Sequence, residues 1–228
     1  MNQYQPLKSQ FLAESGLNMQ AIFDVNQLPT GFIKPVDEKY TQLIVFAHGG
    51  KELWRGLKTA ELNSDNPVDD YSVRLVKAYF RTNFPHNQYK LLYPSNSPIG
   101  LRALGEYAGW HHDSPFRVGM NETWGSWFAY RVVLLADTNL PINQKIQGSS
   151  PCHLCEPKIC LSTCPAHALE TGTLVLSKCV NYRKKTESLC KHSCLSRVSC
   201  PVGKEHQYTE EQINYHYSVS LKMIRAIY

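Results

Sequence analysis

The sequence predicts an α/β protein in which a layered sheet domain precedes a small cysteine-rich module and a C-terminal helix. Three observations predict this. Apolar runs with strand spacing alternate with helical patterns over the first 148 residues, which contain no cysteine. All eight cysteines lie between Cys152 and Cys200, and a helix-capping pattern follows them. We therefore expect three parts, residues 1–148, 149–205 and 206–228.

The front part starts with short elements. Residues 7–15 are predicted to form a helix and residues 17–25 a strand. A second strand is expected at 40–47, where the continuous apolar centre indicates burial on both faces. A turn then starts at His48, beside two glycines, where open sheets admit ligands. His48 is therefore a candidate ligand contact, or equally an exposed loop residue.

The clearest helix of the front part opens at Asn66 and Pro67. Asparagine is a preferred N-cap, proline fits the first helical position, and the acidic residues that follow favour the positive end of the helix dipole. A strand at 89–93, a helix at 97–107 and a long strand at 126–137 complete the front part.

The last helix starts with a capping box formed by Thr209 and Gln212. Its inner face carries five apolar or aromatic residues: Ile213, Tyr217, Leu221, Ile224 and Tyr228. We interpret this stripe as packing of the helix against the body of the protein.

The cysteines form two groups, each ending in Cys-Pro. The groups are Cys152-x2-Cys155-x4-Cys160-x3-Cys164-Pro165 and Cys179-x10-Cys190-x3-Cys194-x5-Cys200-Pro201. The first group is close to the bacterial ferredoxin run, in which the fourth cysteine ligates the neighbouring cluster. Applied to both groups, this crossing predicts two 4Fe-4S clusters, one bound by Cys152, Cys155, Cys160 and Cys200, the other by Cys164, Cys179, Cys190 and Cys194.

Two other uses of eight cysteines remain open. Four thiolates also suit zinc, and the spacing of Cys152 and Cys155 fits a zinc knuckle. A disulfide framework would suit the even count, but it is typical of secreted chains with cysteines spread along them. Iron is favoured because it prefers soft thiolate ligands and because the Cys-Pro endings interleave.

The segment 150–204 carries the whole formal net charge of +5. Oxidised cubanes with four thiolates carry about two negative charges each, so the segment can balance its own clusters. The run Arg183-Lys184-Lys185 could instead dock an acidic electron donor or an RNA backbone. We interpret this run as a solvated loop.

No apolar run approaches the roughly 20 residues of a membrane span, and residues 1–10 lack the basic-then-apolar order of a secretory signal. We therefore expect a soluble cytoplasmic protein without a membrane partner. A reducing cytoplasm also keeps thiols free.

A familiar order of motifs runs from Gly109 to Pro201. It comprises Gly109-Trp110, Gly125-Ser126-Trp127-Phe128, the first cysteine group followed by Ala166-His167-Ala168-Leu169, and Cys179-Val180-Asn181-Tyr182. This order resembles the epoxyqueuosine reductases, relatives of the reductive dehalogenases. The resemblance implies a cobalamin-dependent oxidoreductase with a nitroreductase-like α/β domain and a ferredoxin-like module that carries two 4Fe-4S clusters.

The same resemblance assigns cofactor binding to six residues: Gly109, Trp110, Gly125, Ser126, Trp127 and Phe128. Gly125 would permit a close approach of the backbone to the corrinoid. From the residues alone, a glycine followed by paired aromatics is more typical of a packed strand entrance.

The sequence departs from the family pattern in three places. His111, His112 and Asp113 stand where the family has a glycine and a lysine, and no carboxylate occurs in residues 93–98, near the family's aspartate proton donor. One helix follows the cysteines in place of the helical repeats that help those enzymes to hold tRNA. We therefore do not expect a tRNA substrate.

Other residues could supply the proton. Tyr93 is a candidate because the dehalogenase relatives use a tyrosine and because a nearby cation can lower the pKa of a phenol. His111, His112 and Asp113 form a second candidate, since an adjacent imidazole and carboxylate can share a proton near neutral pH. A polar surface turn explains the same three residues without chemistry.

We expect electrons to enter from a reduced flavodoxin or a ferredoxin-type donor and to pass through the clusters. They would reach a cofactor bound by residues 1–148, cobalamin by the resemblance or flavin instead, which would reduce a small-molecule substrate. The alternatives are a non-catalytic electron carrier and a corrinoid-binding or processing protein.

Overall fold

The computed structural model describes residues 3–33, 38–95 and 99–228. The chain divides into two units, of which unit 1 comprises residues 1–110 and 128–147. Unit 2 comprises His111–Trp127 and Gly148–Tyr228. Residues 111–127, which the sequence assigned to the front part, therefore group with the cysteine-rich segment and the C-terminal helix.

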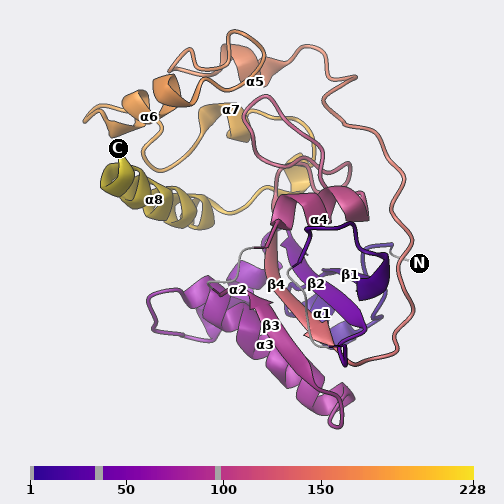
Figure 1. The fold of residues 1–228 in the computed structure, drawn as a ribbon. Coiled ribbons are helices and arrows are strands. Elements are labelled where there is room, and N and C mark those ends of the chain that lie inside the picture. Colours follow the sequence, from indigo (N-terminus) through magenta and orange to yellow (C-terminus); the bar gives the residue numbers. More distant parts are fainter. Residues whose placement is uncertain (1–2, 34–37, 96–98) are drawn as a thin grey trace. The chain divides into compact units, whose positions relative to one another are not determined.

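Unit 1 is built on an antiparallel sheet of four strands in the order β1-β2-β4-β3 (Figure 1). The strands are β1 (Met19–Asp24), β2 (Gln42–Gly49), β3 (Tyr89–Tyr93) and β4 (Phe128–Ala136). All four predicted strands are confirmed. Every residue of β2 is buried, as its apolar centre predicts.

Strand β2 continues through His48 and Gly49, so the predicted turn at His48 is wrong. The Asn18 side chain explains the longer strand. Its Nδ2 donates to the Gly49 carbonyl at 3.0 Å, and its Oδ1 accepts from the Gly49 N–H at 2.8 Å. The chain turns at Gly50, whose φ is +75°.

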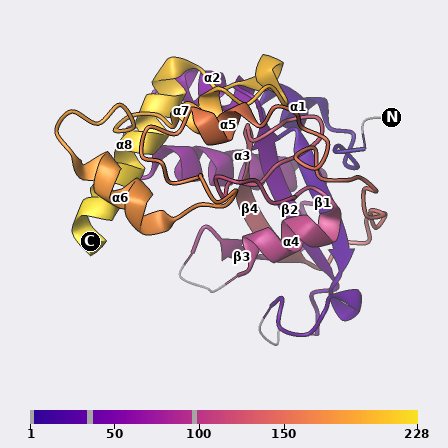
Figure 2. The same ribbon diagram turned by 90° about the horizontal axis from the view of Figure 1, so that it is seen from above.

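The helices of unit 1 are α1 (Gln10–Glu14), α2 (Glu52–Thr59), α3 (Pro67–Asn83) and α4 (Leu101–Ala108), with a 3-10 turn η1 (Val25–Gln27). Helix α3 starts at Pro67 as predicted, although the Asn66 side chain makes no capping hydrogen bond. The predicted first residue of α4, Ser97, lies outside the described residues. Helices α3 and α4 cover opposite faces of the sheet (Figure 2).

Unit 2 contains α5 (Ile159–Ser162), α6 (Leu176–Lys184), α7 (Leu195–Val198), η2 (Lys204–His206) and α8 (Glu210–Ile227). Thr209 caps the N-terminus of α8, since its hydroxyl accepts from the Gln212 N–H at 3.2 Å. The reciprocal bond of the predicted capping box is not formed, because the buried Gln212 Oε1 has no hydrogen-bond partner in the described part of the chain. Helix α8 packs on α6, and α5 packs on α7. No helix in the described ranges is long and apolar enough to cross a membrane.

The α/β class is thus confirmed. The nitroreductase-like and ferredoxin-like descriptions of the two parts remain predictions.

Candidate metal centres

All eight cysteines lie in unit 2 and are free thiols. They approach one another as two groups of four around two cavities. One cavity is lined by Cys152, Cys155, Cys160 and Cys200, which we call the Cys152 group. The other is lined by Cys164, Cys179, Cys190 and Cys194, which we call the Cys164 group. Each group takes three cysteines from one sequence segment and one from the other, as the crossing rule requires.

The thiols that raise one another's pKa belong to the same group of four. Burial raises the pKa of Cys160 to about 11, with Cys200 the largest contributor among the other thiols. Burial raises the pKa of Cys179 to about 11, with contributions from Cys194 and from Cys164 across the segment boundary. Without a metal these thiols would hold their protons at neutral pH, so metal binding must release protons.

The Cys152 group encloses a small cavity. Its volume is about 10 Å³, which is room for about one water molecule. Phe116 and Met120 form part of the apolar cluster in which Cys160 and Cys200 are buried. The ligand type fits a cubane, but these thiols must move apart to admit one.

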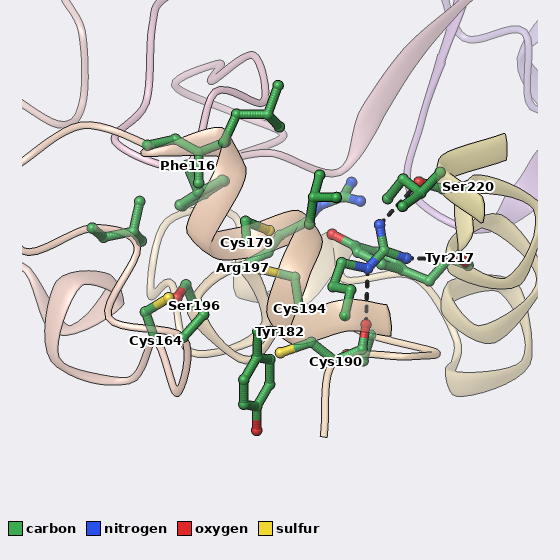
Figure 3. A pocket seen from close by; sticks show the side chains of 18 of the residues that line it. Phe116, Cys164, Cys179, Tyr182, Cys190, Cys194, Ser196, Arg197, Tyr217 and Ser220 are labelled. Atoms are coloured by element: carbon green, nitrogen blue, oxygen red, sulfur yellow. Dashed lines mark hydrogen bonds between the residues drawn. The ribbon is translucent and has the colours of Figure 1, made fainter. Parts of the chain in front are cut away.

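The Cys164 group surrounds a larger cavity of about 500 Å³ (Figure 3). Cys179 comes from α6, Cys194 caps the N-terminus of α7, and α8 contributes Tyr217 and Ser220 to the wall. This cavity has the room and the four thiols that a cubane needs.

Arg183 borders the Cys164 group and is only 6% exposed. Its guanidinium donates to the Cys190 carbonyl, the Tyr217 carbonyl and the Ser220 hydroxyl at 2.9–3.0 Å, the bonds dashed in Figure 3. The interpretation of residues 183–185 as a solvated loop is therefore wrong for Arg183. It lies on α6 and points into the protein, where Nε, Nη1 and Nη2 each donate one hydrogen bond, to the Cys190 loop or to α8.

Arg197 is a second buried cation on the wall of the same cavity. Its guanidinium donates to the Ser126 carbonyl at 2.6 Å and to the Ser126 hydroxyl at 3.1 Å. It also lies 4.4 Å from the ring centre of Trp127 and 5.4 Å from that of Tyr208. Sequence analysis missed both arginines as site residues, although each follows a cysteine by three or four positions on a helix.

A bare metal ion has no ready site in the described ranges. No three His, Cys, Asp or Glu side chains there stand close enough to hold one ion. A single zinc ion needs its thiolates at about 2.3 Å, whereas the four thiolates of a cubane bind four different irons. The distances among the four sulfur atoms of a group therefore distinguish a zinc site from an iron-sulfur cluster site.

Three of the residues assigned to cofactor binding pack inside unit 2. Gly125 has a φ of +57°, and a Cβ there would lie 2.1 Å from the Val202 carbonyl, so its close approach is to the chain itself. Ser126 and Trp127 are fully buried and contact Arg197. These contacts account for their burial without a cofactor.

The other three pack inside unit 1. Gly109 ends α4 with a φ of +76°, and a Cβ there would lie 1.9 Å from the Ile146 carbonyl. Trp110 is buried and stacks on Tyr130 with an interplanar angle of 8°, and Phe128 meets the same ring edge-on. A role of the six residues in cofactor binding stays a prediction.

Tyr93 lies at the end of β3 in a polar array of unit 1. Burial raises its pKa, Asp69 raises it further, and Arg131 opposes both. The expectation that a cation lowers the pKa of this phenol is therefore not met, because burial outweighs Arg131. Arg131 Nε donates to His48 Nδ1 at 3.0 Å, and Arg131 Nη1 lies 3.7 Å from Asp69 Oδ1. His48 is fully buried, so its interpretation as an exposed loop residue is wrong.

His111, His112 and Asp113 belong to unit 2, apart in the chain from the Tyr93 array. His112 exchanges backbone hydrogen bonds of 2.9 and 2.8 Å with Met120. The His111 ring packs against Gly119, where an added Cβ would lie 2.6 Å from it. Their role as proton donors stays a prediction.

Comparison with known proteins gave matches in structure alone. No protein-family model matches the sequence, and no curated protein matches it. An epoxyqueuosine reductase determined with an epoxyqueuosine-modified tRNA stem loop matches with a TM-score of 0.54 at 14% identity, over 93% of this chain and 69% of its own. The Bacillus subtilis epoxyqueuosine reductase matches with a TM-score of 0.52, also at 14% identity, over 92% of this chain and 68% of its own.

The second set of matches consists of reductive dehalogenases. A catabolic reductive dehalogenase determined with 3-bromo-4-hydroxybenzoic acid has a TM-score of 0.54 at 14% identity, over 95% of this chain and 36% of its own. Another dehalogenase structure, described in terms of B12-dependent dehalogenation, has a TM-score of 0.53 at 14% identity, with the same coverage. The chain thus resembles epoxyqueuosine reductases and B12-dependent reductive dehalogenases in fold, which confirms the predicted resemblance.

Proposed function

We propose that the protein is an iron-sulfur oxidoreductase in which two 4Fe-4S clusters deliver electrons to a cofactor that reduces a small substrate. One observation carries this proposal. The eight thiols gather as two sets of four that exchange one cysteine between the segments, with Cys200 in the first set and Cys164 in the second. Two-cluster ferredoxins share this arrangement, and two separate zinc knuckles do not need it.

The size of the larger cavity is compatible with a cluster. The four thiols line part of a cavity of about 500 Å³, which has room for four metal atoms. Each cluster would be held by its four cysteines and would supply one-electron redox chemistry when bound. The chain's own share is to bury the thiols and to exclude water from them.

Cobalamin is the cofactor that we propose for unit 1, by the likeness of fold to the B12-dependent dehalogenases. A corrinoid, when bound, supplies the electron transfer to the substrate. Contacts with it from Gly109, Gly125 and their aromatic neighbours stay a prediction, and in this structure those residues are packed against the chain. Flavin remains the alternative cofactor.

We propose Tyr93 as the residue that holds the proton. The phenol is protonated at neutral pH, as tyrosines ordinarily are, and can therefore carry the proton, although burial makes it a weaker acid than an exposed tyrosine. Arg131 ties the fully buried His48 to the carboxylate of Asp69 beside it. These two contacts hold Arg131 in place, and its charge opposes the rise in the pKa of Tyr93.

Elemental analysis of protein purified without oxygen tests the proposal. We expect iron and sulfide in equal amounts, about eight of each per chain, and uptake of cobalamin with a change in its absorption bands. Stoichiometric zinc without sulfide would contradict it.

Substrate assays separate the enzyme from its alternatives. The epoxyqueuosine reductase match was determined with a modified tRNA stem loop, so epoxyqueuosine-containing RNA belongs among the substrates assayed. Reduction of no substrate by protein that takes up cobalamin would favour a corrinoid carrier. Iron-loaded protein indifferent to cobalamin and flavin would favour a simple electron carrier donating to an acidic partner.

A further inference from the structure

Two buried cations on the wall of the Cys164 cavity have no anionic partner. Arg183 is 6% exposed and Arg197 is 9% exposed, and neither pairs with a carboxylate in the described parts of the chain. Arg131, equally buried in unit 1, lies 3.7 Å from Asp69. A buried charge without a counter-charge is strongly destabilising, so two such cations imply an anion in their neighbourhood.

The partners that the two arginines do have are neutral. Arg183 is held by two backbone carbonyls and the Ser220 hydroxyl. Arg197 is held by the carbonyl and hydroxyl of Ser126 and by aromatic rings. These contacts fix where each guanidinium lies without cancelling its charge.

Both guanidinium groups are placed toward the Cys164 group. Arg183 follows Cys179 by one helical turn of α6, and Arg197 follows Cys194 by three residues in α7. Both arginines line the same cavity as all four cysteines of the group. The described wall of the Cys152 cavity has one cation, the exposed Lys158.

We propose that Arg183 and Arg197 are the internal counter-cations of the cluster bound by the Cys164 group and make it the higher-potential cluster of the two. This inference rests on the proposed function. Reduction adds one negative charge to a cluster, and a buried cation stabilises that charge more than one in contact with water does. In each transfer a one-electron donor is oxidised, the cluster is reduced, and no covalent bond changes. At equilibrium the electron therefore resides on the Cys164 cluster.

A redox titration followed by electron paramagnetic resonance tests the proposal on the iron-loaded full chain. The Cys164 cluster is identified as the signal lost in Cys164→Ser. In Arg183→Met we expect its reduced-to-oxidised ratio at a fixed potential to fall about tenfold, which is 59 mV for a one-electron couple. The potential of the Cys152 cluster should stay unchanged, and Arg197→Met should act in the same direction.

Two further variants separate charge from structure. Arg183→Lys keeps the charge and loses part of the hydrogen bonding, so we expect it to restore most of the wild-type potential. Lys185→Gln removes the same charge from an exposed position two residues away and should leave both potentials unchanged. Arg183→Met also leaves the carbonyls of Cys190 and Tyr217 without this donor, so its urea midpoint is measured beside its cluster potentials.

Three results would overturn the inference while the proposed function stands. They are a Cys164 cluster of lower potential than its neighbour in the wild type, equal shifts of both clusters in Arg183→Met, and equal potentials in Arg183→Met and Arg183→Lys. Should Arg183→Met fail to fold, the comparison of Arg197→Met with Lys185→Gln decides in the same way. Wild-type protein without iron would overturn both the inference and the proposed function.

Discussion

The Cys152 group and the Cys164 group each consist of four cysteine thiols, but their surroundings differ. The Cys152 group closes on about 10 Å³, between Phe116 and Val202, with one exposed lysine on its wall. The Cys164 group opens on about 500 Å³ and is bordered by two buried arginines and by helix α8. The two groups therefore have the same type of ligand, but they differ in the charged residues around them and in the volume of their cavities.

This difference shows that ligand spacing and cluster environment come from different parts of the sequence. The cysteines supply both sets of ligands, but only the Cys164 group has counter-cations, which Ser126 and helix α8 hold in place. A variant can consequently affect one group and spare the other.

Phe116 lines both cavities and is 7% exposed. Phe116→Ala should lower the free energy of unfolding by about 3–5 kcal/mol, because it opens a cavity in the apolar cluster around Cys160 and Cys200. Both clusters should then bleach faster in air, as measured by their visible absorption. Loss of one cluster alone would show that Phe116 does not separate the two.

Ile213 is buried with Trp127 and Tyr208, next to Tyr217 and Arg197. Ile213→Ala should lower the free energy of unfolding by about 2–5 kcal/mol. Urea unfolding and the rate of cluster loss in air measure the effect. We expect faster loss of the Cys164 cluster only, and an equal effect on both clusters would contradict the separation.

Gly125 lies next to the Cys152 group, because Val202, which it packs against, lines the Cys152 cavity. Gly125→Ala should cost about 1 kcal/mol for the left-handed backbone and about 1–3 kcal/mol more for the clash. Gly172→Ala is the matched control, since Gly172 has a φ of +82° and no atom near an added Cβ. Equal urea midpoints for the two variants would contradict the close packing at Gly125.

A substitution at Glu170 is expected to have the smallest effect. Its exposed carboxylate lies 3.2 Å from Lys178 and 2.9 Å from His167, and Lys178 lowers its pKa. Glu170→Gln should change neither the urea midpoint nor either cluster, because exposed ion pairs contribute little. A shift in one cluster potential would show that surface charge also matters to these centres.

Much of the fold could be predicted because its signals are local. The strands at 89–93 and 126–137 carry continuous or alternating apolar runs. Pro67 starts a helix by its fixed backbone angle and Thr209 by its side-chain hydroxyl. Helix α2 (Glu52–Thr59) was missed, since it has no side-chain cap and packs its few apolar residues against α3.

The candidate site was predictable in its ligands and not in its charges. The order of cysteines and prolines predicts which thiols meet, whereas the burial of Arg183 depends on the Tyr217 carbonyl and the Ser220 hydroxyl of α8, more than 30 residues away. In sequence that arginine is part of a basic run, and basic runs are usually solvated. The array of His48, Asp69 and Arg131 is likewise formed by tertiary contacts alone.

Iron counting in paired cysteine variants tests the crossed arrangement of the thiols most directly. Cys164→Ser combined with Cys190→Ser removes two ligands of one group, so the account predicts about half of the wild-type iron. Cys152→Ser combined with Cys164→Ser removes one ligand from each group and should leave almost none. Iron retained in the variant with Cys152→Ser and Cys164→Ser, but lost in the variant with Cys164→Ser and Cys190→Ser, would contradict the crossed arrangement.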